Sequence, residues 1–288
     1  MAESDDISVS IVGMCESTRA AVAVLLNIAE APVDADSIAS FVHQVSLSDG
    51  GFHGDAVYSS DEWLTSIASD RSGSMFASSM EGSIHVFDGT AWSIVPAATG
   101  VGMNCVHAVG TNIALAGGLD GSIFQVTGTR ATLVAGPTGS RLNSIDGCAS
   151  DCIYAVGDDG QIVRFDGRQW LPEDALTNAN LLSVLCLSPD NVYVAGADGM
   201  MFRWNGVTWS AVAAPSITIS SLAPYGGKIF AAGGKAGIFS TDGGPLKQVK
   251  PVALYRVEAS NGLLFGAASR FFAWHDGNSW QGGQYDPT

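Results

Sequence analysis

Short apolar or alternating segments, separated by Gly, Asp and Asn, recur along most of this chain. Residues 141–174 show the pattern best, with four segments that read LNSIDGC, CIYAVGD, QIVRFD and QWLPE. Segments of this length and pattern, bounded by turn residues, predict short β-strands. We therefore expect a unit of four antiparallel strands, A to D in chain order, joined by tight turns.

The B–C turn of this unit is copied at a constant interval. An acidic residue followed by glycine recurs every 39 residues, at Glu81-Gly82, Asp120-Gly121, Asp159-Gly160 and Asp198-Gly199. The C–D turn keeps the same interval, at Asp88-Gly89, Thr127-Gly128, Asp166-Gly167 and Asn205-Gly206. Such pairs predict two-residue hairpins, because Gly, Asn and Asp tolerate positive φ. Four-stranded units repeated at about 40 residues are typical of β-propeller blades.

Six units can be laid out, and they cover 62–96, 102–135, 141–174, 180–213, 217–250 and 253–282. The acidic N-terminal segment 1–61 contains ISVSIVG, AVAVLLNI, SIASFVHQV and DAVYSS, which fit the four strands of a divergent blade. TRAAVAVLLNIAE and SIASFVHQV also fit helices. We expect an all-β propeller of seven blades that forms one domain, with the repeats in 62–288. Six blades plus an N-terminal extension are the alternative.

Charge is scarce and unevenly placed. Charged residues make up 14% of the chain and the net charge is −15, of which residues 1–62 contribute −10 through eleven acids and the single Arg19. Such a field repels nucleic acid and anionic lipid and favours a basic protein partner. The alternative explanation is that the charge serves solubility alone.

Targeting signals and disulfide patterns are not visible in the sequence. No apolar run of about 18 residues predicts a membrane span. The acidic start MAESDDISVS does not resemble a secretory signal, so we expect a cytoplasmic protein. The five cysteines are an odd number in a long chain, which favours reduced thiols.

The repeat resembles a known group of propellers. CIYAVGDDGQIVRFDGRQW and NVYVAGADGMMFRWNGVTW are similar to repeats common in bacterial proteins, loosely grouped with WD-repeat-like and BNR-like (Asp-box) families. The likeness covers roughly 62–282, but the Asp-box serine and the Gly-His and Trp-Asp pairs of WD repeats are missing. It implies a propeller fold and a habit of binding, and no reaction.

The acids of the B–C turns are the main candidates for partner binding. Alternate turns of an antiparallel unit lie at opposite ends, so these acids should share one face. Turn geometry alone also favours Asp-Gly, and a residue chosen for geometry still projects its charge. Asp61, Glu62 and Trp63, at the start of the first unit, complete a candidate surface that comprises Glu81, Asp120, Asp159, Asp198, Trp63, Asp61 and Glu62.

Tryptophans recur on the predicted D strands, at Trp92, Trp170, Trp209 and Trp280, where we expect them to pack between blades. Trp274 lies outside this register and is a second candidate for contact, with packing inside strand C as the alternative.

No motif for catalysis, phosphate binding or a cofactor is present. Cys105 and His107 form a C-x-H pair, and Cys148 and Cys152 a C-x3-C pair, which is weak support for a metal. We therefore assign no catalytic residues, no metal and no cofactor.

The leading hypothesis is a non-enzymatic propeller that binds a basic protein and is a monomer when free. An acidic bacterial propeller of this size suits an immunity protein that occludes the active site of a basic toxin or effector. A carbohydrate-binding propeller and a glycan hydrolase or lyase with a site at the central channel are the alternatives.

Overall fold

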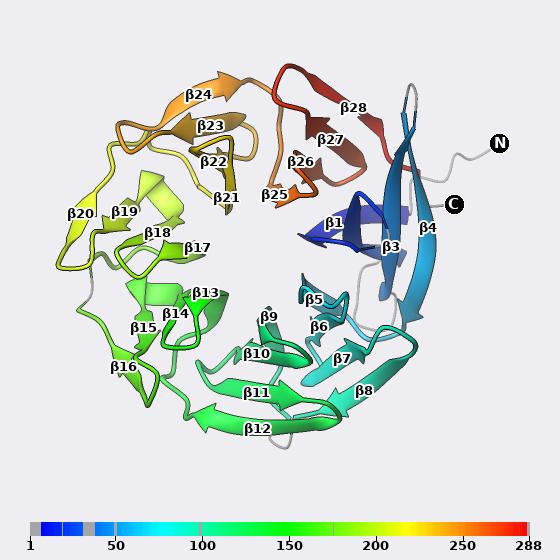
Figure 1. Cartoon of the computed structure of the whole chain (residues 1–288), viewed down its shortest axis with the longest axis horizontal. Helices are drawn as coiled ribbons and strands as arrows, with labels where there is room; N and C mark the ends of the chain where they lie inside the picture. The colour runs from blue at the N-terminus through cyan, green and yellow to red at the C-terminus, as the bar shows by residue number, and fades with distance from the viewer. Residues whose placement is uncertain are drawn as a thin grey trace.

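The computed structural model describes residues 7–18, 20–30, 38–48, 51–97, 100–174 and 176–286. In these ranges seven four-stranded antiparallel sheets are arranged in a ring, as the blades of a β-propeller (Figure 1). Each sheet is built from four consecutive strands, so the predicted strands A to D of each unit form one blade.

The first three blades have the following strands. Blade 1 contains β1 (Ile7–Cys15), β2 (Val22–Glu30), β3 (Ile38–Ser48) and β4 (Gly51–Ser60). Blade 2 contains β5 (Leu64–Ser69), β6 (Met75–Ser79), β7 (Ser83–Phe87) and β8 (Trp92–Pro96). Blade 3 contains β9 (Met103–Gly110), β10 (Ile113–Gly118), β11 (Ile123–Thr127) and β12 (Arg130–Ala135).

The other blades follow the same plan, and two of them have a short 3₁₀ turn between B and C. Blade 4 contains β13 (Leu142–Ala149), β14 (Cys152–Gly157), η2 (Asp158–Gly160), β15 (Ile162–Phe165) and β16 (Trp170–Pro172). Blade 5 contains β17 (Leu181–Ser188), β18 (Asn191–Gly196), η3 (Ala197–Gly199), β19 (Met201–Trp204) and β20 (Trp209–Ala211). Blade 6 contains β21 (Ser221–Tyr225), β22 (Lys228–Ala232), β23 (Ile238–Thr241) and β24 (Lys247–Lys250). Blade 7 contains β25 (Arg256–Ser260), β26 (Leu263–Ala268), β27 (Phe271–His275) and β28 (Trp280–Gln284).

The hydrophobic core lies between blades. The middle strands β6 and β7 are buried along their whole length, whereas the outer strand β8 is largely exposed. Phe76 of blade 2 and Phe124 of blade 3, for example, belong to one buried cluster. Strands that are covered on both faces explain why the B segments read as continuous apolar runs.

Blade 1 decides between the two architectures considered above. Its β1 pairs with β2, β2 with β3 and β3 with β4, all antiparallel. The prediction of seven blades is therefore confirmed, and both the six-blade alternative and the helices considered for this segment are wrong. The reason is that the β-branched side chains of this segment are buried against both neighbouring blades. Residues 1–6, 31–37 and 49–50, which carry several of the N-terminal acids, lie outside the described residues.

The ring closes through side chains between blades 7 and 1, since no sheet shares strands from both ends of the chain. Tyr285, after β28, is 2% exposed, and its hydroxyl lies 2.7 Å from Nδ1 of His43 in β3. The Asn261 amide donates to the carbonyl oxygens of Ser17 and Ala20. These bonds fix blade 7 against blade 1.

The B–C turns of blades 4 and 5 are the expected two-residue hairpins, whereas those of blades 2 and 3 differ. In blade 4, Asp159 and Gly160 both have positive φ, and Gln161 N–H donates to Asp158 O (3.1 Å), as in a type I′ turn. Blade 5 repeats this turn. In the B–C turns of blades 2 and 3, only the glycine (Gly82 or Gly121) has positive φ, and its N–H donates to the carbonyl oxygen of the residue three positions before it. A serine follows the glycine in both of these blades, and its hydroxyl bonds within the turn.

Glycine is required in these turns because their φ is positive and also because the following D–A connection approaches them closely. A Cβ on Gly160 would collide with the carbonyl oxygen of Thr177, in the connection that leads to the next blade. The glycines of the acid-Gly pairs therefore let each B–C turn pack against the neighbouring D–A connection.

Candidate functional site

The four acidic B–C turns lie at one end of their blades, together with the D–A connections that they contact. We call this side of the ring the B–C face. Glu81, Asp159 and Asp198 are exposed there, and Asp120 is half-buried. The structure thus brings these four sequence candidates to one face, each from a different blade.

Local hydrogen bonds hold three of these carboxylates in place. Glu81 accepts a bond from Trp63 N–H (3.1 Å), and Asp159 accepts one from the Ser140 hydroxyl (3.1 Å). Asp120 accepts both the N–H and the hydroxyl of Ser122. A carboxylate that is held by hydrogen bonds keeps its negative charge at a fixed position on the B–C face.

The three candidate residues that precede β5 are Asp61, Glu62 and Trp63, and they differ in exposure and in hydrogen bonding. Asp61 is exposed, and Trp63 is 38% exposed beside the Glu81 carboxylate. Glu62 instead accepts bonds from the Ser83 hydroxyl (2.5 Å) and His85 Nε2 (3.0 Å) inside the blade. Burial raises the pKa of Glu62, but these bonds outweigh it and hold the pKa below its ordinary value. Glu62 therefore has a place in the packing of blade 2 that the sequence did not reveal.

Among the described residues, the acids of the B–C turns lie in blades 2 to 5. In blade 6 the B–C turn carries Lys235, and in blade 7 it carries Arg270; both side chains are exposed. The described B–C turns therefore carry acids in blades 2 to 5 and basic residues in blades 6 and 7, and such a difference would orient an approaching charged partner.

The tryptophans of the D strands pack between blades, as the sequence predicts. Trp92 stacks on Tyr58 of blade 1 at 4.2 Å, and Trp209 meets the edge of the Tyr154 ring of blade 4 at 6.0 Å. Trp170 and Trp280 belong to buried clusters shared with the preceding blade. Trp274 is 6% exposed in the core between blades 1 and 7, so it is a packing residue and not a contact candidate.

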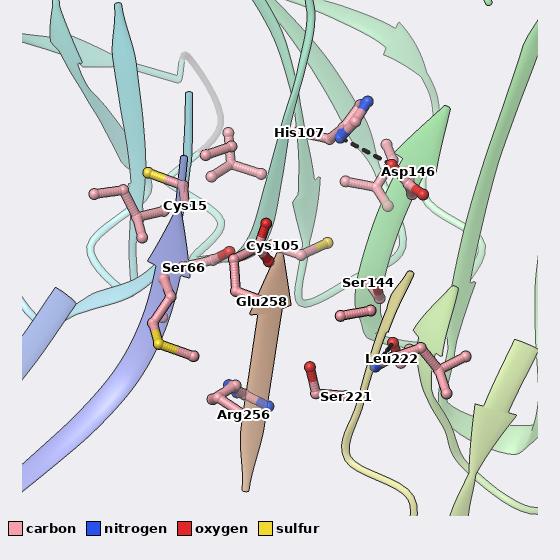
Figure 2. A pocket seen from close by; sticks show the side chains of 18 of the residues that line it. Cys15, Ser66, Cys105, His107, Ser144, Asp146, Ser221, Leu222, Arg256 and Glu258 are labelled. Carbon is pink, nitrogen blue, oxygen red and sulfur yellow. Dashed lines mark hydrogen bonds and ion pairs between the residues drawn. The ribbon is translucent and has the colours of Figure 1, made fainter. Parts of the chain in front are cut away.

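A cavity of about 360 Å³ runs along the ring axis and is lined by the innermost strand of every blade (Figure 2). Polar side chains of these strands connect each blade with the next. Thr65, Asn104 and Asn143 donate to the carbonyl oxygens of Met103, Leu142 and Leu181. Ser144, Ser183 and Ser221 accept the N–H groups of Val184, Leu222 and Val257.

The sequence reading missed these inner-strand residues, although a signal was present. Thr65, Asn104 and Asn143 stand 39 residues apart, as do Ser144 and Ser183. The interval equals that of the repeated turns. It marks positions on the innermost strands where polar side chains form hydrogen bonds to the next blade.

Five acidic or basic side chains line the cavity, namely Glu16, His107, Asp146, Arg256 and Glu258. His107 Nδ1 lies 3.3 Å from Asp146 Oδ1, and Asp146 Oδ2 accepts the Cys186 N–H (2.7 Å). Burial raises the pKa of Asp146, although His107 opposes the rise. Burial, followed by the charges of Asp146 and Glu16, raises the pKa of Glu258 to about 8.

Arg256 links blade 7 to its surroundings at the cavity wall. Its Nε donates to Val12 O (2.9 Å) and its Nη1 to Ser220 O (3.2 Å), so it joins blade 7 to blade 1 and to the connection before β21. Burial lowers its pKa.

In the part of the chain that the structure describes, the cysteines are not grouped with histidines or acids as metal ligands. Within the described ranges, no group of three or more His, Cys, Asp or Glu side chains is placed to hold a metal ion. Cys148 and Cys152 are free thiols with their sulfur atoms 2.9 Å apart, and Cys105 lies in the core between blades 3 and 4. Nor does any helix of the described part have the length and apolar character to cross a membrane.

Comparison with known proteins identifies the fold. No family model and no curated protein matches the chain. Among solved structures, the WD40 β-propeller domain of Doa1 is similar over 93% of this chain and 92% of its own, with a TM-score of 0.73 and 13% identity. A chain from the crystal structure of a mitotic checkpoint complex is similar over 99% of this chain and 93% of its own, with a TM-score of 0.70 and 14% identity. This chain has the fold of a seven-bladed WD40 propeller. At these identities the likeness shows the fold alone.

Proposed function

We propose that this propeller is a non-enzymatic binding protein that captures a basic protein on its B–C face. The observation that carries the proposal is the acid at one equivalent position in blades 2 to 5, namely Glu81, Asp120, Asp159 and Asp198. Fixed charges on a rigid face speed the encounter with a partner of opposite charge and orient it. One of the similar WD40 chains comes from a multiprotein complex, which is consistent with this use of the fold.

The more specific form of the proposal is an immunity protein of the bacterial cytoplasm. It would bind as a monomer and cover the active site of a basic toxin or effector. A net charge of −15 supports this form, because a strongly acidic surface opposes a basic catalytic face. Asp61 and Trp63 extend the binding surface, with Trp63 as its exposed aromatic anchor.

The test neutralises the four acids without disturbing their turns. Asn tolerates the positive φ of Asp159 and Asp198, so the variant carries E81Q, D120N, D159N and D198N. A matched control neutralises four acids of the C–D turns, on the opposite face: Asp88, Asp166, Asp242 and Asp276. Asn205 already occupies this turn position in blade 5 and accepts the same backbone bonds, so the control should fold normally.

The probe is the product of the gene adjacent to this one, and the readout is its association rate at low and high salt. We expect the B–C variant to associate about tenfold or more slowly at low salt and to lose most of its salt dependence. The control should associate at nearly the rate of the unchanged protein. Equal losses in both variants, or no binding of the probe, would count against the proposal. Protection of cells from the probe's toxicity distinguishes an immunity protein from another protein-binding propeller.

The two alternatives have less support. A carbohydrate-binding propeller would use repeated aromatic residues at its surface, but Trp92 and Trp209 are engaged between blades. A hydrolase or lyase at the channel would use the carboxyl groups of the cavity, but one of these, Asp146, is engaged by His107 and by the Cys186 N–H.

A further inference from the structure

Two thiols meet at the A–B turn of blade 4. Cys148 is the next-to-last residue of β13 and Cys152 is the first residue of β14, and their sulfur atoms lie 2.9 Å apart. Both are free thiols. A small movement of the two side chains would bring the sulfur atoms to bonding distance.

The register of the hairpin produces this approach. Ala149 pairs with Cys152 and Gly147 pairs with Ile153, so Cys148 is the extra residue of a β-bulge. A bulge redirects the side chain of its strand. Cys148 consequently packs against the buried cluster that contains Cys152, between blades 4 and 5.

The fold does not require sulfur at either position. Blade 5 has the same bulge at Leu187, and its β18 begins with Asn191. These two residues stand 39 positions after Cys148 and Cys152, which is the interval of the repeat. A thiol at each position of blade 4 is therefore a property of this blade and not of the propeller architecture.

The two thiols differ in their access to solvent. Cys148 is half-buried, and the turn residues Ala149, Ser150 and Asp151 beside it are exposed. Cys152 is 5% exposed. A reagent that comes from solvent therefore meets Cys148 first, with Cys152 behind it as the second thiol.

The other three cysteines are placed differently. Cys15 and Cys105 belong to buried clusters between other pairs of blades. Cys186 packs in the same cluster as Cys152, but its thiol donates to the Asp146 carbonyl oxygen (3.3 Å). The structure thus favours one pairing among the five thiols.

We propose that Cys148 and Cys152 are a redox-sensitive pair, which a low-molecular-weight disulfide converts from two thiols into one intramolecular disulfide. In the first step the Cys148 thiolate attacks one sulfur of the oxidant, whose S–S bond breaks and releases one thiol. In the second step the Cys152 thiolate attacks Cys148 Sγ and releases the other half of the oxidant as a thiol. Two electrons pass to the oxidant, and the protons of the two cysteine thiols are taken up by the released thiols.

The surroundings of the pair affect the rate of both directions. Burial and the neighbouring Cys152 thiol raise the pKa of Cys148, so its thiolate is scarce near neutral pH and the first step is slow. A thiol of high pKa is also a poor leaving group, so the disulfide is reduced slowly once it has formed. The disulfide should therefore persist after the oxidant is removed, until a strong reductant is added.

The inference is independent of the proposed protein partner. The pair lies at the A–B turn, and Asp159 lies in the B–C turn at the opposite end of blade 4. The acids of the B–C face take no part in the thiol chemistry. Their variants and the cysteine variants test the two proposals separately.

The test incubates the full chain with glutathione disulfide at about pH 8.5, where thiolate is more abundant. Remaining thiols are then blocked with N-ethylmaleimide and located by mass spectrometry. The unchanged protein should fall from five free thiols to three, because two are joined. The tryptic peptide 142–164, which contains Cys148 and Cys152 and no other cysteine, should be lighter by two hydrogen atoms. Dithiothreitol should restore all five thiols.

Three variants separate the two steps. Cys152→Ser lacks the second thiol, so glutathione should remain on Cys148 at about tenfold or more its level in the unchanged protein. Cys148→Leu copies the residue of the blade 5 bulge and should leave buried Cys152 unmodified. Cys186→Ser, the matched control from the same cluster, should form the disulfide as the unchanged protein does.

Circular dichroism confirms that each variant is folded, and the result for the unchanged protein decides without them. Five thiols that remain free, glutathione that stays on Cys148 of the unchanged protein, or a disulfide of either cysteine with Cys186 overturns the proposal.

Discussion

The Glu258 carboxyl group, which lines the axial cavity, leads to a prediction about stability. In the unfolded chain Glu258 has its ordinary pKa of 4.5, and in the fold its pKa is about 8. Above pH 4.5 the unfolded chain gains the free energy of ionisation while the folded protein keeps the proton. The contribution of Glu258 to stability is therefore full below pH 4.5 and is lost progressively as the pH rises to about 8.

The magnitude follows from the shift. At about 1.36 kcal/mol for each pKa unit, the loss reaches an upper bound of about 5 kcal/mol above pH 8. An unfolding entropy of about 2.1 cal/mol/K per residue, over 288 residues, converts this to a change in Tm of about 8 °C. Glu258→Gln has no proton to lose, so it removes the whole effect.

Thermal unfolding followed by circular dichroism, from about pH 5 to pH 9, measures the difference. The Gln variant should match the unchanged protein near pH 5 and exceed its Tm increasingly towards pH 9. Asp242→Asn, the exposed control, should follow the unchanged protein throughout. If the curves of the unchanged protein and the Gln variant are parallel, then Glu258 ionises in the fold as it does in the unfolded chain. That result would contradict a raised pKa of Glu258 in the fold.

Two further predictions concern ring closure and the repeated turn. Tyr285→Phe removes the hydroxyl that pairs with Nδ1 of buried His43, and should lower the free energy of unfolding by about 1–3 kcal/mol in urea titration. An unchanged midpoint would mean that this pair does not hold blades 7 and 1 together. Gly160→Ala should lower the Tm more than Gly128→Ala does. Both glycines have positive φ, but only the first would place its Cβ against the Thr177 carbonyl oxygen, whereas the space around Gly128 is open. Equal losses would show that φ alone, and not the approach of the next connection, requires glycine there.

The repeated units were predictable because their signals are local. An acid-Gly pair at one interval marks a turn wherever it stands, and strands follow from the apolar segments on either side. Blade 1 was ambiguous because the segment between β2 and β3 contains no acid-Gly pair, and because β1 to β4 are longer than the strands of the other blades. Its apolar runs fit two secondary structures, and the contacts with blades 2 and 7 selected the strands.

The candidate site was predictable in part for the same reason. The alternation of turns puts Glu81, Asp120, Asp159 and Asp198 on one face in any antiparallel blade. The sequence could not show that the Glu62 side chain bonds inside blade 2 while the Asp61 side chain is exposed. The two acids are adjacent in the chain and differ only in their tertiary contacts.

By itself the sequence determined the strand-turn unit, its interval, the acidity of the B–C face and the absence of linear catalytic motifs, because each of these depends on neighbours along the chain. Only the tertiary structure decided the seventh blade, the closure of the ring and the axial cavity. Arg256 and Val12 are 244 residues apart in the chain, yet they bond at the axis. Glu258 receives its environment from strands of other blades. A channel exists only once the ring is closed, so the properties of its side chains are set by closure and not by local pattern.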